Sequence, residues 1–254
     1  MNAFSVLSIR FSTNKLQSSI GSTSTYFPFM TIFMILHALV GTAVVCSGGT
    51  ALLLRKGSLQ HKLAGRLFVI SMVLMGPVIA IEAFFTPGSV SPLGILFVLL
   101  VVYLVVSAWS AISHPEHMLN LLDRAAPVLA LCISMACLIV GIDAMSVQTH
   151  HQDLPPKEAY FFFAALALVA MLLDIINVRV GGVRGKHRIV RHVWRMSCAL
   201  FFATSTLFTG PGAVVFPESV RGNAVLSIPQ LLVVIFACFW TYRLIFSRSA
   251  VTSP

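Results

Sequence analysis

The sequence predicts an all-α protein, a bundle of seven transmembrane helices, and three observations predict this fold class. Of the 254 residues, 57% are hydrophobic and 10% carry a formal charge, whereas soluble domains average about 45–50% and about 25%. Seven stretches approach the roughly 20 apolar residues that cross a bilayer. The basic residues gather between alternate stretches, as they do in the cytoplasmic loops of membrane proteins.

Each predicted helix is an apolar run that ends at a charged or turn-forming segment. No segment between the runs is long enough for a soluble domain, so we expect one membrane domain over residues 29–247. A short C-terminal tail follows at 248–254. In chain order, the predicted spans lie near Phe29–Leu54, Leu63–Phe85, Pro92–Ile112, Ala125–Met145, Ala159–Val178, Met196–Val215 and Ala224–Ile245.

The first 28 residues differ in composition from the rest of the chain. They are rich in serine, contain Arg10 and Lys15, and lack acidic residues. This composition favours a flexible tail or translation from Met30, and an organellar transit peptide is the alternative.

The basic residues predict the orientation. Lysine and arginine are retained on the cytoplasmic side of a membrane, so we expect the N-terminus outside and the C-terminus inside. We also expect anionic lipids at the basic face and no nucleic-acid partner, despite a net charge of +9. On one side lie 13 of the 17 basic residues: Arg55, Lys56, Lys62, Arg66, Arg124, Arg179, Arg184, Lys186, Arg188, Arg191, Arg195, Arg243 and Arg248.

Two predicted cytoplasmic turns share a short pattern. Around His61 and around His187, a histidine, a basic residue and an aliphatic residue stand at the start of a helix. One interpretation is a 3+1+3 arrangement, in which helices 1–3 and 5–7 are parallel repeats joined by helix 4. A chance match, or the shared need for a basic loop, is the other.

Three blocks carry a family resemblance. They are His37 with Gly41, the segment Gly57–Arg66 and the segment Arg191–Met196. With these blocks the chain resembles a family of bacterial predicted multi-pass membrane proteins that is catalogued as a domain of unknown function. The resemblance spans most of the chain after residue 28 and implies a seven-helix protein of the bacterial inner (plasma) membrane. It implies no mechanism, since the family has no settled activity.

Ionisable residues inside spans are costly and mark candidate sites. In the predicted outer half, His37, Glu82 and Asp143 lie on three different helices. If they converge, they form a protonatable site for a transporter-like or sensing protein, which is the leading functional hypothesis. The alternative is that Glu82 and Asp143 lie at the hydrated interface.

The predicted inner side holds a denser cluster. Its members are His61, Asp174, Arg191, His192 and Arg195. We expect Asp174 to pair with Arg191 or Arg195, because pairing neutralises a charge that would otherwise face lipid.

The second functional hypothesis is a membrane redox protein that holds haem b. Two of His37, His61 and His192 would be its axial ligands. Otherwise no cofactor is predicted.

No motif for a metal site or an enzyme is found. The loop clusters His114–His117 and His150–Asp153 lack a second ligand group at a diagnostic distance, so they are interpreted as solvated loops. Phosphate-binding, dinucleotide and nucleophile-elbow motifs are absent. The sequence leaves the substrate and homo-oligomer formation open.

Overall fold

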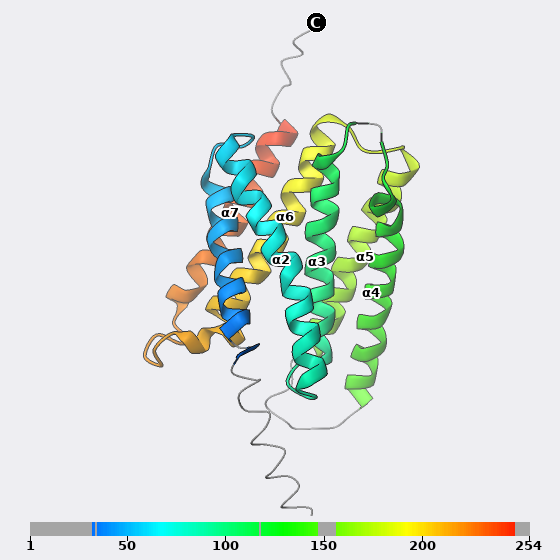
Figure 1. Cartoon of the computed structure of the whole chain (residues 1–254). Helices are drawn as coiled ribbons and strands as arrows, with labels where there is room; N and C mark the ends of the chain where they lie inside the picture. The colour runs from blue at the N-terminus through cyan, green and yellow to red at the C-terminus, as the bar shows by residue number, and fades with distance from the viewer. Residues whose placement is uncertain (1–31, 34, 117, 147–155, 247–254) are drawn as a thin grey trace, which may run out of the picture.

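The computed structural model describes residues 32–33, 35–116, 118–146 and 156–246. All regular secondary structure in these residues is helical, and the long helices run alongside one another in a bundle (Figure 1). The predicted tails, 1–28 and 248–254, lie outside the described residues, as does the loop segment 150–153. The helices are Ile35–Leu53, α2 (Leu59–Phe85), α3 (Pro92–Ser113), α4 (Leu121–Ser146), α5 (Lys157–Arg179), α6 (Gly185–Phe208) and α7 (Ile228–Phe246), with short 3-10 turns η1 (Pro211–Val215) and η2 (Ala224–Ser227) before α7.

Six of the described helices are long and apolar enough to cross a membrane, which supports a multi-pass membrane protein. The exception is α6. Its first half carries four basic residues, Lys186, Arg188, Arg191 and Arg195, yet it lies inside the bundle between α3 and α7 (Figure 1). The predicted span Met196–Val215 differs from this helix at both ends. The helix starts 11 residues earlier, at Gly185, and stops at Phe208.

Hydrogen-bonding caps explain why two helices start before their apolar runs. The Ser58 hydroxyl accepts a hydrogen bond from the His61 amide at 3.1 Å, so α2 begins at Leu59 rather than Leu63. The Asn120 side chain accepts from the Asp123 amide at 2.7 Å, and α4 begins at Leu121 rather than Ala125. Such caps satisfy amide groups that have no partner within the helix.

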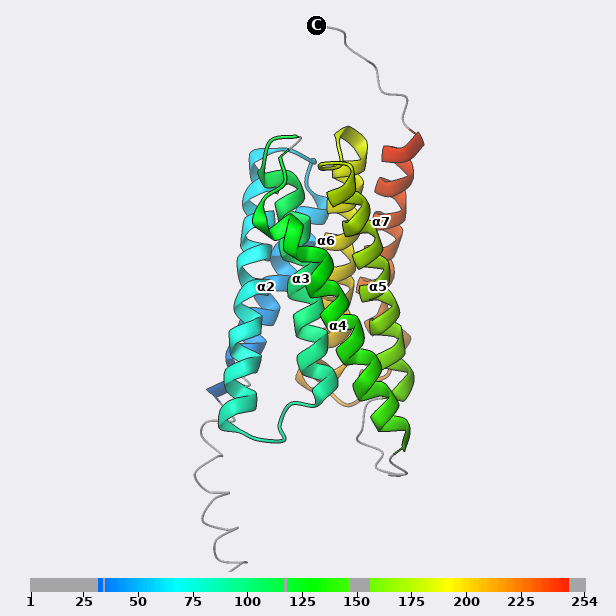
Figure 2. The same cartoon turned by 90° about the vertical axis from the view of Figure 1, so that its right-hand side faces the viewer.

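Helix α3 lies at the centre of the packing. One core joins α3 to α4 and α5 around Leu100 and Leu104, where α5 presents a row of small residues, Ala164, Ala167 and Ala170. The other joins α3 to the first helix, α2, α6 and α7 around Val105. Small residues let neighbouring helices approach closely in a membrane protein. Figure 2 shows α3 between α2 and α4.

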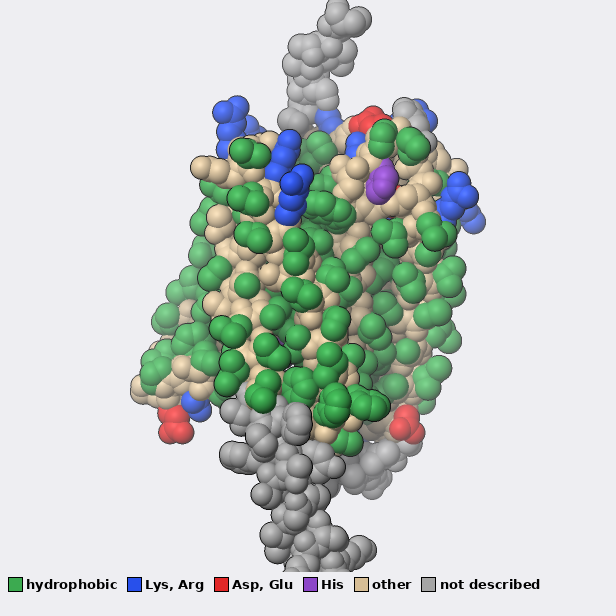
Figure 3. Space-filling view, viewed as in Figure 1, with side chains coloured by type: hydrophobic (Ala, Val, Ile, Leu, Met, Phe, Trp, Pro, Cys, Tyr) green, Lys and Arg blue, Asp and Glu red, His purple; other side chains and the backbone are tan. Residues whose placement is uncertain are grey.

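Lysine and arginine side chains gather at one end of the molecule, which we call the basic end (Figure 3). It comprises the turn 54–58, residues 114–116 and 118–120 between α3 and α4, and the turn 180–184. Lys56 donates to the carbonyl oxygens of Ala51 and Leu52 at 3.0 and 2.6 Å, and its ammonium lies 5.2 Å from the Trp240 ring centre. This joins the end of the first helix to α7. Partial burial lowers the pKa of the Lys56 ammonium.

The contact between α4 and α5 provides a test of the packing. A Cβ atom at Gly141 would lie 2.9 Å from Tyr160 Cβ, whereas one at Gly49 would meet nothing within 4 Å. We expect Gly141→Ala to lower the free energy of unfolding in detergent by about 1–3 kcal/mol, because α5 must shift. The matched variant Gly49→Ala is expected to be neutral or stabilising by up to about 1 kcal/mol. Equal stabilities would contradict this packing.

A candidate functional site: the buried ion cluster

Four charged side chains meet in the half of the bundle nearest the basic end. We call Asp123, Asp174, Arg191 and Arg195 the ion cluster. Their exposed fractions are 4%, 0%, 6% and 0%. Asp123 comes from the first turn of α4 and Asp174 from the last turns of α5. The two arginines are four residues apart on α6, so they project from the same face of that helix.

Arg195 is fully enclosed, as is Asp174. Its guanidinium donates to Asp174 at 2.6 Å, to the Ser107 hydroxyl at 2.5 Å and to the Ala170 carbonyl oxygen at 3.2 Å. It also lies 5.4 and 5.2 Å from the ring centres of Tyr103 and Trp194. Aromatic faces stabilise a desolvated cation, so this site is built to hold one.

Asp174 is shared by two arginines and one tyrosine. Oδ1 accepts from Arg195 and, at 3.0 Å, from Arg191, while Oδ2 accepts from the Tyr103 hydroxyl. Charge-assisted hydrogen bonds of this kind are roughly twice as strong as neutral ones. The predicted pairing of Asp174 with Arg191 or Arg195 is present with both arginines.

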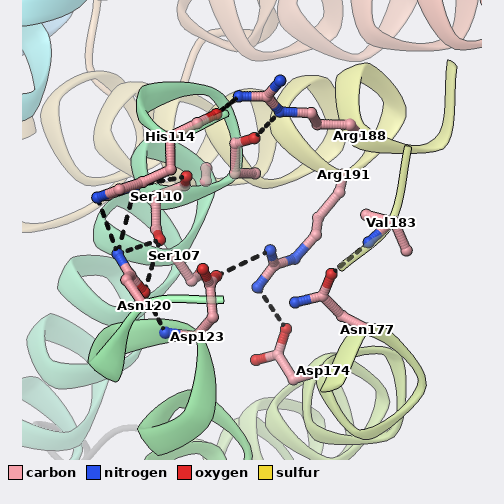
Figure 4. A network of polar contacts seen from close by, with 12 residues as sticks. Ser107, Ser110, His114, Asn120, Asp123, Asp174, Asn177, Val183, Arg188 and Arg191 are labelled. Carbon is pink, nitrogen blue, oxygen red and sulfur yellow. Dashed lines mark hydrogen bonds and ion pairs between the residues drawn. The ribbon is translucent and has the colours of Figure 1, made fainter. Parts of the chain in front are cut away.

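Arg191 joins the two carboxylates. Besides Asp174 it contacts Asp123 Oδ1 at 3.2 Å, and Figure 4 shows its guanidinium between the two. Two positive and two negative charges thus balance within a buried cluster. The cluster ties α6 to α4 and α5, although α6 packs mainly on α3 and α7.

A polar rim joins the ion cluster to the basic end. Arg188 donates to the carbonyl oxygens of Ala111 and His114, and it lies 3.9 Å from Glu116. Asn120 donates to the Ser110 hydroxyl at 3.0 Å. Between this rim and the ion cluster lies a cavity of about 20 Å³, lined by Asp123, Asn177, Arg188 and Arg191 among others. A space of that size holds a water molecule or a small ion.

Three N–H groups at the site have no hydrogen-bond partner within the described residues. They are Asn177 Nδ2, Arg191 Nε and Arg195 Nε. The Asn177 oxygen is occupied, because it accepts from the Val183 amide at 2.9 Å in the turn between α5 and α6. A buried donor without a partner costs about 1–3 kcal/mol, so the site has unused capacity for a hydrogen-bond acceptor.

The structure divides the predicted inner cluster in two. Asp174, Arg191 and Arg195 meet, but His192 and His61 lie apart from them. His192 Nδ1 lies 3.1 Å from the Ala108 carbonyl oxygen, and His61 Nδ1 lies 2.9 Å from the Ala51 carbonyl oxygen. The two imidazoles interact electrostatically with each other and with Lys56. They form a separate histidine pair beside the ion cluster.

The structure does not bring together all three residues of the predicted outer site. His37 and Glu82 are half-buried and interact electrostatically. Asp143 is exposed near the end of α4. Figure 2 shows the lower ends of α2 and α4 on opposite sides of the bundle, so Asp143 does not join the other two.

The described residues contain no group of three or more His, Cys, Asp or Glu side chains that could hold a metal ion. In the loop 114–116, the ring nitrogens of His114 lie 3.4 Å from the Asn120 amide. The Glu116 side chain contacts the start of α6, where Oε1 accepts a hydrogen bond from the Gly185 amide at 3.2 Å. His117 is outside the described residues.

Sequence reasoning missed three important members of the site. Asp123 lies just outside the predicted span, which begins at Ala125. Tyr103 and Asn177 lie inside apolar runs, and the average hydropathy of such a run does not reveal a single polar residue. A useful signal was present, since a buried tyrosine hydroxyl requires a partner and Asp174 is a carboxylate within reach on another helix.

Comparison of the chain with known protein families, with curated proteins and with solved structures finds no match. The resemblance to the bacterial membrane-protein family therefore stays a prediction. Function has to be argued from the site itself.

The ion cluster predicts a large difference between single and paired substitutions. Asp174→Leu leaves Arg195 buried without a carboxylate, so we expect the free energy of unfolding to fall by about 3–5 kcal/mol. Asp174→Leu/Arg195→Met removes both charges and is expected to recover most of the loss, with Arg191 and Asp123 still paired. The measurement is reversible unfolding in mixed micelles.

The control for this cycle is Arg124→Met, which removes an exposed charge from the first turn of α4. Its effect should stay within about 0.5 kcal/mol, as is usual for exposed positions. A paired variant less stable than Asp174→Leu alone would contradict the charge-balance account.

Proposed function

We propose that the chain is an integral membrane protein of transporter-like or sensing type, and that the ion cluster is its protonation-linked site. The observation that carries the proposal is a set of buried charges beside unpaired donors and a cavity. Purely structural ion pairs in a membrane protein are expected to be fully satisfied. Ionisable residues within a bilayer mark functional sites by default.

Asp123 is the acid best placed to exchange protons. It lines the cavity that leads to the basic end, while Asp174 lies behind it and is held by two arginines and Tyr103. Protonation of Asp123 would weaken its pairing with Arg191 and leave that guanidinium bound to Asp174 alone. This gives the site two charge states with different contacts between α4 and α6, as a transport or sensing step requires.

In this proposal the protein crosses the membrane seven times, with the N-terminus outside and the basic end inside the cell. The concentration of lysine and arginine at that end supports the orientation and suits anionic lipid headgroups. The proposed location is the plasma membrane of a bacterium. The ion cluster replaces His37, Glu82 and Asp143 as the proposed proton site, because Asp143 lies apart from the other two.

Proton flux into proteoliposomes tests the function. With a potassium diffusion potential and a pH dye inside the vesicles, we expect Asp123→Asn to lower protein-dependent flux by about a hundredfold, as loss of a positioned proton-transfer group does. The matched control is Glu218→Gln, which changes an exposed carboxylate in the segment between η1 and η2 and should keep wild-type flux.

Two outcomes would contradict the proposal. One is unchanged flux in a folded Asp123→Asn protein. The other is loss of flux in Asp143→Asn with full flux in Asp123→Asn, which would return the site to the opposite end of the bundle.

The histidine pair favours a second candidate, a redox protein that binds haem b. Because a carbonyl oxygen can only accept a hydrogen bond, Nδ1 of each histidine carries the proton. In the neutral ring, Nε2 then carries the lone pair that can bind a metal. A backbone carbonyl on Nδ1 is the usual support of a histidine ligand. His37 no longer fits this hypothesis, since it lies with Glu82 near the other end of the bundle.

The second candidate is tested by an absorbance spectrum of protein expressed with ample haem. It predicts a Soret band that is lost in His192→Ala and in His61→Ala but kept in His187→Ala, which alters an exposed histidine on the same helix as His192. A colourless wild-type protein would eliminate this candidate.

A further inference from the structure

The start of α6 is capped by a carboxylate from a distant part of the chain. The preceding residue, Arg184, makes no side-chain cap. Instead the Gly185 amide donates to Glu116 Oε1 at 3.2 Å, from the loop between α3 and α4. The amino end of a 24-residue helix attracts anions, and Glu116 already places a tethered one there.

Glu116 is held weakly. Its side chain is 45% exposed and its oxygen lies 3.9 Å from the Arg188 guanidinium. Arg188 itself is fixed, because it donates to two backbone carbonyl oxygens of α3 and the following loop. The carboxylate can therefore swing into solvent while the arginine stays in place.

Behind Arg188 the cavity offers two donors without partners. Asn177 and Arg191 are 2% and 6% exposed and both line the cavity. Asn177 Nδ2 and Arg191 Nε have no acceptor within the described part of the chain. Figure 4 shows the Asn177 amide pointing toward Arg191. These atoms can satisfy an acceptor that enters from the basic end.

The charges at the site favour an anion once Glu116 has moved. Arg191 and Arg195 are balanced by Asp123 and Asp174 in the ion cluster. The remaining pair is Arg188 and Glu116, so displacement of Glu116 leaves one uncompensated positive charge at the mouth. The cavity of about 20 Å³ has room for about one water-sized particle, so it suits a monatomic anion better than a tetrahedral oxyanion.

We propose that this cavity binds a halide-sized inorganic anion, in exchange with the Glu116 carboxylate. Arg188, Arg191 Nε and Asn177 Nδ2 supply the contacts. The inference rests on the proposed function and deepens it, since an anion beside Asp123 would repel the ionised carboxylate and favour its protonated form. Anion binding requires no proton transfer, so the two proposals can fail separately. A single water molecule is the competing occupant, and it would bind without displacing Glu116.

Bromide titration of the purified full chain tests the proposal. Calorimetry in detergent, with sodium gluconate added to keep the ionic strength constant, should give one saturable site per chain, and sulfate should give none. Glu116→Gln removes the tethered competitor and should tighten bromide binding about two- to fivefold, the range expected for an exposed ion pair. Glu218→Gln should leave the affinity unchanged.

Asn177→Asp keeps the oxygen that accepts from Val183 but replaces the unpaired N–H with a negative oxygen. It should weaken bromide binding at least about tenfold, provided that circular dichroism shows a folded protein. Absence of a saturable site, or an affinity that neither Glu116→Gln nor Asn177→Asp changes, would overturn the proposal and identify water as the occupant. If proton flux is lost in Asp123→Asn while no bromide binds, only the anion proposal fails.

Discussion

The neutralisation of charge inside an apolar bundle is the constraint on which the rest of this structure depends. A charged side chain at the centre of a transmembrane helix costs roughly 2.5–3.5 kcal/mol on insertion scales, and α6 places two arginines, Arg191 and Arg195, nearly or fully buried among apolar helices. Asp174 compensates Arg195 and shares Arg191 with Asp123. A helix with four basic residues in its first half can therefore lie among apolar helices.

This constraint also decides which helices must be neighbours. The carboxylates stand on α4 and α5, and the hydroxyls of Tyr103 and Ser107 stand on α3, so these three helices have to surround the first half of α6. Apolar packing then completes the bundle on both sides of α3. The turn between α5 and α6 is correspondingly tight: Gly181 and Gly182 have φ values of 68° and 101°, which glycine adopts without strain. It brings Asp174 back within reach of Arg191.

Hydropathy predicted most of the fold because six described helices each contain a stretch that is long and apolar enough to cross a membrane. It failed at α6, since a window average cannot recognise charges that another helix will neutralise. The pairing of Asp174 with an arginine was predictable from the cost of leaving it alone in lipid. Asp123 was not, because its place in the site depends on the Asn120 cap that starts α4 early. Asp143 shows a second limit of sequence reasoning. It was grouped with His37 and Glu82 by its predicted depth in the membrane, but residues at the same depth on different helices need not meet.

The account requires α6 to cross the membrane with its arginines inside the bundle, and site-directed cysteine labelling tests this most directly. In a background from which the five native cysteines have been removed, Arg184→Cys lies just before α6 and Glu218→Cys lies after it, and both positions are exposed. A membrane-impermeant maleimide added to intact cells should label Glu218→Cys alone, and Arg184→Cys should react only after the cells are opened. Labelling of both positions from the same side would show that α6 does not cross, and the account would be wrong.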